Sequence, residues 1–143
     1  MRPPAIKPVS VLVVDGSALI RRRLRALLAE DDHIRWVGQV ASRAEAWTLF
    51  DQIRPEAVLL DLRLPDGGGL ELLCRIKQAT PFCLVIVLTN FRESIFRHES
   101  HRCGADYFLH KSTEFDQVAN LLHHYATQRN PQDSALRTPT LKV

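Results

Sequence analysis

Short apolar runs alternate with polar, turn-forming residues along the chain, and five of these runs have the length of β-strands. They are rich in Val, Ile and Leu, and none is long enough to cross a membrane. The expected strands cover residues 9–14, 34–40, 57–60, 82–88 and 105–109.

After each expected strand, apolar side chains recur at helical spacing. Four of the five expected helices begin at a local signal. In chain order, these signals are Ser17 as a cap, a capping box of Ser42 and Glu45, the run Gly67-Gly68-Gly69, and Ser112 or Thr113 as a cap. The helix expected over residues 93–102 has the weakest apolar stripe.

The fivefold alternation of strand and helix predicts an α/β fold with a doubly wound, five-stranded parallel sheet and helices on both of its faces. A length of 143 residues suits one domain, which we expect over residues 9–126. Residues 1–8 are rich in proline and are predicted to be a flexible N-terminus. Residues 127–143 are polar and lack periodicity, which predicts a flexible tail.

The charge balance is mildly basic, with a net charge of +3, and permits an anionic partner without requiring one. The densest basic run, Arg21-Arg22-Arg23, falls inside a helical pattern and is predicted to be a solvated helix face rather than a nucleic-acid patch. The N-terminal residues lack the apolar core of a signal peptide, so a cytoplasmic protein is expected.

The chain has three cysteines, Cys74, Cys83 and Cys103, which are far apart in sequence. Their odd number and the absence of paired metal-ligand spacing argue against a disulfide or zinc framework. They are predicted to be buried, reduced thiols.

Four chemically active side chains fall at the ends of four different expected strands: Asp15, Asp61, Thr89 and Lys111. In a doubly wound sheet the carboxyl ends of the strands converge on one crevice. Two carboxylates, a hydroxyl and an ammonium suit phosphoryl transfer, in which one carboxylate attacks phosphorus and the other groups neutralise charge. Taken one at a time, each residue could instead fill a local role as a turn residue, a strand end or a solvated charge.

Four segments carry a resemblance to a known family: Val11–Asp15, Val58–Gly67, Val85–Thr89 and Gly104–Lys111. In order and spacing they resemble the receiver domain of bacterial two-component response regulators, of the chemotaxis-regulator type. The resemblance covers about Val9 to Tyr125 and implies a flavodoxin-like fold with strand order 2-1-3-4-5 and five helices.

The resemblance implies that Asp61 is the phosphoacceptor. It also implies that Mg²⁺ is held by the carboxylates of Asp15 and Asp61 and by the backbone carbonyl of Arg63. Where the family has a second consecutive acid after the first strand, this chain has Gly16. Loss of one hard anionic ligand is expected to weaken the binding of Mg²⁺.

The resemblance further implies that Thr89 and Lys111 contact the phosphoryl group. Thr89 and Phe108 match the positions of a switch in which the hydroxyl moves towards the phosphate and the aromatic ring turns inward. Ser112 stands where many relatives have a proline, so a cis peptide bond is not expected there.

The function implied is that of a stand-alone receiver rather than an enzyme. Its expected partners are a sensor histidine kinase or phosphotransfer protein and a downstream protein, with no direct DNA binding, no membrane contact and a possible homodimer. Gly16 favours an alternative, a pseudo-receiver that binds proteins without being phosphorylated. A hydrolase with an aspartate nucleophile is less favoured, because Arg63 stands where such enzymes usually carry an acid.

Overall fold

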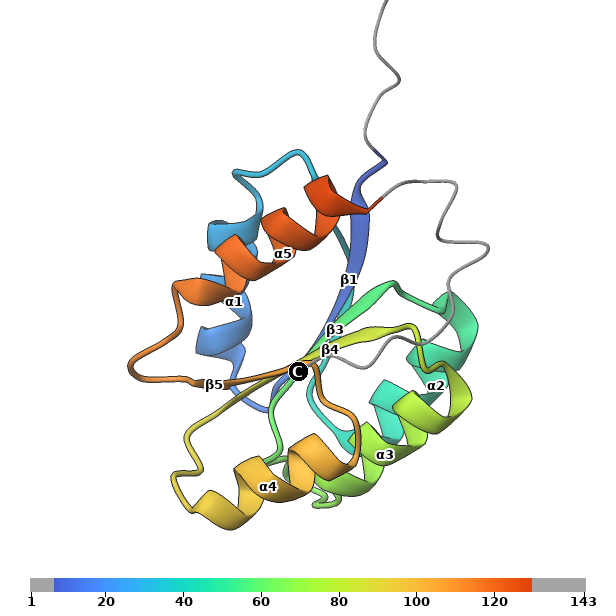
Figure 1. The fold of residues 1–143 in the computed structure, drawn as a ribbon, viewed down its shortest axis with the longest axis vertical. Helices are drawn as coiled ribbons and strands as arrows, with labels where there is room; N and C mark the ends of the chain where they lie inside the picture. The colour runs from blue at the N-terminus through green and yellow to red at the C-terminus, as the bar shows by residue number, and fades with distance from the viewer. Residues whose placement is uncertain (1–6, 130–143) are drawn as a thin grey trace, which may run out of the picture.

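The computed structural model describes residues 7–129. A five-stranded parallel sheet with the order β2-β1-β3-β4-β5 forms its centre, which confirms the expected fold class (Figure 1). The strands are β1 (Val9–Val14), β2 (Ile34–Val40), β3 (Ala57–Leu60), β4 (Leu84–Thr89) and β5 (Tyr107–His110).

Five helices cover the two faces of the sheet, α1 and α5 on one side and α2, α3 and α4 on the other (Figure 1). Their bounds are α1 (Ala18–Leu28), α2 (Arg43–Ile53), α3 (Gly69–Ala79), α4 (Ser94–Arg102) and α5 (Gln117–Gln128). None of the helices within residues 7–129 has the length and hydropathy needed to cross a bilayer.

Alternation of side chains along β1 builds two separate cores. Val11 and Val13 pack on the side of α1 and α5, whereas Leu12 and Val14 pack on the side of α2 and α3. All of these residues are buried, so the central strand is apolar on both faces, as expected of a parallel sheet.

Two predicted helix caps are confirmed. Ser17 Oγ accepts a hydrogen bond from the Ile20 N–H at 3.3 Å, and Ser42 Oγ accepts one from the Glu45 N–H at 3.3 Å. The Ser42 hydroxyl also donates to Glu45 Oε1 at 2.9 Å, so the glutamate contacts the cap through the hydroxyl and not through the Ser42 N–H that a capping box uses.

The predicted cap of α5 is wrong. The helix begins at Gln117 with Asp116 at its N-cap, whereas Ser112 and Thr113 lie in a turn. Glu114 closes this turn: its N–H donates to the His110 carbonyl at 2.8 Å, and its side chain accepts from the His110 N–H at 2.8 Å. These two hydrogen bonds satisfy the backbone N–H and carbonyl of His110 at the end of β5. The helix therefore begins only after this turn.

The edges of three other elements also differ from expectation. β5 spans Tyr107–His110 rather than residues 105–109. β4 begins at Leu84 rather than Phe82, because the Cys83 N–H is bound to the Thr80 carbonyl at 3.0 Å and Phe82 is exposed. α5 continues to Gln128, two residues beyond the boundary drawn from the sequence. Most of the predicted flexible N-terminus and the tail from residue 130 onward lie outside the described residues.

The prediction of three reduced cysteines is wrong for two of them. Cys74 on α3 and Cys103 at the end of α4 form a disulfide, with their Cα atoms 4.7 Å apart. Only Cys83 is a free, buried thiol, and burial raises its pKa to about 12. The disulfide therefore joins α4, whose only buried residue is Ser100, to the better-packed α3.

A count of thiols should detect this bond. Protein unfolded without reductant is expected to show one titratable thiol, from Cys83, and three after reduction. A colorimetric thiol assay in denaturant measures both values, with a Cys83→Ser variant expected to show none before reduction. Three thiols in the unreduced wild type would contradict the pairing.

Candidate functional site

The four strand-end residues predicted from the sequence meet at the carboxyl edge of the sheet. Asp15 follows β1, Asp61 follows β3, Thr89 ends β4 and Lys111 follows β5. Lys111 Nζ lies 2.7 Å from Asp15 Oδ2 and 2.7 Å from Asp61 Oδ2. One ammonium group thus bridges two carboxylates from different strands, and all three side chains are at least nine-tenths buried.

Asp61 is held at both of its carboxylate oxygens. Oδ2 binds Lys111, and Oδ1 accepts the backbone N–H of Arg63 at 3.0 Å. The Asp61 backbone N–H continues the sheet by donating to the Val14 carbonyl at 2.9 Å. Its side chain is therefore fixed by the strand and by the loop that leaves it.

Asp15 is positioned by the start of α1. Its Oδ1 accepts the Ser17 N–H at 2.8 Å, and its backbone carbonyl accepts a hydrogen bond from Arg21 Nη1 at 2.6 Å. Burial raises the pKa of Asp15 and outweighs the hydrogen bonds from Lys111 and the Ser17 N–H, which lower it. The fold therefore holds this carboxylate in a place that disfavours its charge.

Lys111 is a buried cation whose charge its partners stabilise. Burial alone would lower the pKa of its ammonium group, but the hydrogen bonds to Asp15 and Asp61 outweigh burial and raise the pKa. Its backbone N–H donates to the Thr89 carbonyl at 2.8 Å, which fixes the lysine beside the end of β4.

Thr89 is fully buried, and its hydroxyl accepts the Phe91 N–H at 3.3 Å. The ring of Phe91 stacks on that of Phe96 at 4.2 Å, and the Arg63 guanidinium lies 5.6 Å from its centre. The hydroxyl is thus linked through Phe91 both to α4 and to the loop after β3.

Phe108 lies away from the two carboxylates, in a groove between α4 and β5. It is half-buried, and the guanidinium of Arg97 on α4 covers its ring at 4.7 Å. Its neighbour across the sheet is Val87 of β4. The predicted switch aromatic therefore contacts a helix that few buried side chains hold.

Gly16, next to Asp15, has no side chain that could bind a metal ion. A Cβ atom built on it would come 3.2 Å from Cδ of Pro65 and 3.7 Å from the Ala41 carbonyl oxygen. Its φ angle is outside the left-handed region, so the backbone does not require glycine here.

The donor set suits a hard divalent cation. Asp15 and Asp61 offer carboxylate oxygens, the ligands that Mg²⁺ prefers, and with Lys111 their formal charges sum to −1. Gly16 adds no third anion, so the site has fewer ligands than an acid at that position would provide. Chemically, the cluster can present a carboxylate to a phosphorus atom beside a cation and a hydroxyl.

Sequence reasoning missed three contributors: the Ser17 N–H, Arg21 and Phe91. The sequence predicts a solvated face for the run Arg21-Arg22-Arg23, and Arg22 and Arg23 are exposed, whereas Arg21 is half-buried. The available signal was its position one turn after the Ser17 cap, which directs Arg21 back towards the end of β1.

Comparisons with known proteins identify the family and the fold of the chain. The family model described as the response regulator receiver domain matches residues 11–123. The transcriptional regulatory protein BtsR of Salmonella typhi is 34% identical over 130 residues, which are 90% of this chain and 52% of that protein. The DNA-binding transcriptional activator DevR/DosR of Mycobacterium tuberculosis is 29% identical over 88% of this chain and 58% of its own length. The chain thus spans about half the length of these curated relatives.

Two solved structures show the same fold. The response regulator domain of Thermotoga maritima CheB is 28% identical with a TM-score of 0.73, covering 87% of this chain and 100% of that one. A LuxR-family two-component response regulator from Aurantimonas is 23% identical with a TM-score of 0.77, covering 90% and 94%.

Proposed function

Because this chain belongs to the response regulator receiver family, we propose that it accepts a phosphoryl group on Asp61 in two-component signalling. The observation that carries the proposal is the bridge from Lys111 to both Asp15 and Asp61 at 2.7 Å. A buried ammonium beside the acceptor carboxylate can neutralise charge on the transferring group.

In the proposed step, a carboxylate oxygen of Asp61 attacks phosphorus and forms an acyl phosphate. The bond from phosphorus to the donor breaks, and for a phosphohistidine donor the imidazole nitrogen keeps the electron pair and takes a proton. The Arg63 N–H, bound to Asp61 Oδ1, holds the carboxylate in place. Domains of this family act in signalling rather than in metabolism. We also propose that the domain catalyses the hydrolysis of its own phosphoryl group on Asp61.

We propose that Mg²⁺ would be held by Asp15, Asp61 and the backbone carbonyl of Arg63. When bound, it would supply positive charge to the phosphoryl oxygens. Gly16 would make this binding weaker than an acid at the same position would.

The proposed signal passes from Thr89 to Phe108. A phosphoryl group on Asp61 would attract the Thr89 hydroxyl away from the Phe91 N–H, which it now accepts. Movement of Thr89 would open space for the Phe108 ring to turn inward from the groove, where Arg97 now covers it. The surface of α4, β5 and α5 would then change.

The proposed partners are a sensor histidine kinase or phosphotransfer protein and a downstream protein that reads the α4–β5–α5 surface, in the cytoplasm. A homodimer through this surface is part of the same proposal. The curated relatives are named as transcriptional regulators; for the receiver elements described here we propose protein contacts rather than direct DNA binding.

The test is phosphorylation by a small phosphodonor in the presence of Mg²⁺. The wild type should gain one phosphoryl group that is labile to strong acid, to alkali and to hydroxylamine, as an acyl phosphate is, while Asp61→Asn should gain none. Intact-mass spectrometry measures the gain, and Asp66→Asn, which changes an exposed aspartate in the loop after β3, is the matched control. Absence of label on the wild type from any donor or kinase would refute the proposal.

A second candidate, a phosphorylation-independent interaction module, is favoured by Gly16, which has no side chain to bind the metal ion. It predicts that Asp61→Ala leaves partner binding unchanged. A partner affinity that depends on Asp61 would exclude this candidate.

A further inference from the structure

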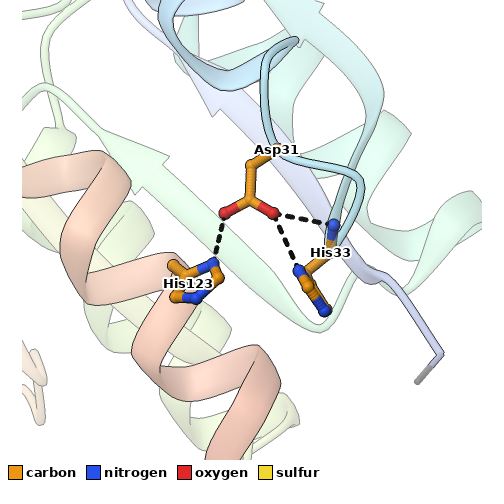
Figure 2. Close-up of side chains that lie close together, drawn as sticks. All are labelled: Asp31, His33 and His123. Carbon is orange, nitrogen blue, oxygen red and sulfur yellow. Dashed lines mark hydrogen bonds and ion pairs between the residues drawn. The ribbon is translucent and has the colours of Figure 1, made fainter.

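A second cluster of ionisable side chains lies far from the phosphoacceptor. Asp31, in the loop after α1, lies between two imidazole rings (Figure 2). His33 Nδ1 is 3.0 Å from Asp31 Oδ1, and His123 Nδ1 is 2.6 Å from Asp31 Oδ2. His123 comes from α5, so the cluster joins segments 92 residues apart in sequence.

The backbone holds two of the three groups in place before any ligand binds. The Asp31 N–H donates to the Leu28 carbonyl at 3.2 Å, and the Asp31 carbonyl accepts the Ile34 N–H at 3.1 Å. The His33 N–H donates to Asp31 Oδ1 at 2.8 Å, which orients the carboxylate. On α5, the buried Leu122 anchors the turn that carries His123.

The carboxylate of Asp31 is anionic. Its partial burial would raise its pKa, but the His33 N–H and the imidazoles of His123 and His33 outweigh that effect and hold the pKa below its usual value. A carboxylate faced by two imidazole nitrogens is the donor combination found in sites for borderline transition metals.

We propose that Asp31, His33 and His123 form a binding site for a divalent transition-metal ion of the Zn²⁺ class. One ligand atom from each residue lies within 4.8 Å of the others. Ligands of a tetrahedral Zn²⁺ ion lie about 3.3 Å apart, because Zn–N and Zn–O bonds are about 2.0–2.1 Å long. Rotation of the side chains closes this difference, since the His123 side chain is 51% exposed and the His33 side chain 33% exposed.

Three protein ligands leave a fourth position for water, and the exposure of His123 directs that position to solvent. Mg²⁺ is a poor occupant, because it prefers an all-oxygen shell, so this site and the Asp15–Asp61 pair would select different metals. Binding displaces the imidazole–carboxylate hydrogen bonds, and a proton on a ligating Nδ1 atom moves to Nε2 of the same ring or, from a charged ring, to solvent.

The two sites lie at opposite edges of the sheet. His33 directly precedes β2, at the amino edge, and its carbonyl accepts the Val9 N–H at 2.8 Å, whereas Asp61 follows β3 at the carboxyl edge. A metal at the His33 edge would tie α5 to the loop after α1 without touching the phosphoacceptor.

Other soft ligands in the described residues are poorly placed to compete. Cys74 and Cys103 are joined in a disulfide, and Cys83 is a buried thiol whose pKa of about 12 keeps it protonated. His98 and His101 share a turn of α4 and are the alternative imidazole pair that the test must separate.

The test is a titration of the tag-free protein with ZnCl₂, followed by isothermal calorimetry in a buffer that does not bind zinc. The wild type should bind one ion per chain. His123→Gln and Asp31→Asn should each weaken binding by at least about tenfold, since even removal of a group that only supports a ligand costs about 10–100-fold in affinity. Thermal unfolding with and without Zn²⁺ gives a second readout, because a bound metal stabilises the folded state.

Two controls separate this site from adventitious binding. His124→Gln changes the neighbouring exposed imidazole on α5, and a His98→Gln, His101→Gln double variant removes the pair on α4. Both should bind Zn²⁺ like the wild type. Binding that survives both His123→Gln and Asp31→Asn, or a wild type with no stoichiometric binding, would overturn the proposal.

Discussion

Replacement of Lys111 by methionine is expected to destabilise the fold by about 3–5 kcal/mol, because it leaves buried carboxylates without their counter-charge. Lys111 is the shared partner of Asp15 and Asp61, and its side chain is only 8% exposed. Methionine keeps the length and much of the volume, so the change removes mainly the charge. Urea unfolding of the wild type and the variant measures the difference.

The contribution of charge can be separated from that of shape. Lys7→Met removes an exposed lysine and should change stability by no more than about 0.5 kcal/mol. A Lys111→Met, Asp61→Asn double variant should recover part of the loss, since it removes one of the two unpaired carboxylates. A Lys111→Met protein as stable as Lys7→Met would contradict the importance of the bridge.

The pH dependence of stability gives a further check on Lys111. Its pKa in the folded protein lies above the ordinary value of 10.5, so the folded state holds the proton more tightly than the unfolded state does. Its contribution is therefore fully present below pH 10.5 and is lost as the pH rises through the folded pKa. The Lys111→Met variant should lack this alkaline loss.

Most of the fold could be predicted because its signals are local. The alternation of apolar runs and helical stripes predicted every strand and helix, and Ser17 and Ser42 each follow the end of a strand as isolated cap residues. The start of α5 could not be placed in this way. Ser112, Thr113 and Asp116 are all suitable caps, and the choice depends on how Glu114 pairs with the end of β5.

The candidate site was partly predictable for a different reason. Parallel strands bring their carboxyl ends to one edge, so Asp15, Asp61 and Lys111 could be grouped without knowledge of any distance. No comparable rule predicts which residues meet where two helices pack together. Cys74 meets Cys103 because α3 lies beside α4, and nothing in the sequence local to either cysteine indicates the contact.

The two carboxylates of the site are not equivalent. Burial raises the pKa of Asp15, so the folded state disfavours its charge, and its contribution to stability, present below pH 3.8, is lost as the pH rises through the folded pKa. A fold selected for stability alone would place a neutral group there. The Lys111 ammonium offsets part of this cost, and the proposed Mg²⁺ ion would offset more of it.

Gly16→Asp is expected to tighten Mg²⁺ binding by at least about tenfold, equivalent to about 1.4 kcal/mol, because it adds a hard anionic ligand beside Asp15. The backbone accepts the change, since the φ angle of Gly16 is outside the left-handed region. The new Cβ would come 3.2 Å from Pro65 Cδ, so Pro65 must move by a few tenths of an ångström.

Fluorescence or calorimetric titration with Mg²⁺ measures the affinity, and Gly16→Asn is the matched control, with the same shape but no added charge. If Gly16→Asp and Gly16→Asn bind Mg²⁺ equally, the missing anion does not limit the site. If only the aspartate tightens binding and also raises the rate of labelling by a phosphodonor, then Gly16 tunes how readily Asp61 is phosphorylated. In that case Asp61 remains the acceptor in the natural sequence, with a weaker metal site than an acid at position 16 would give.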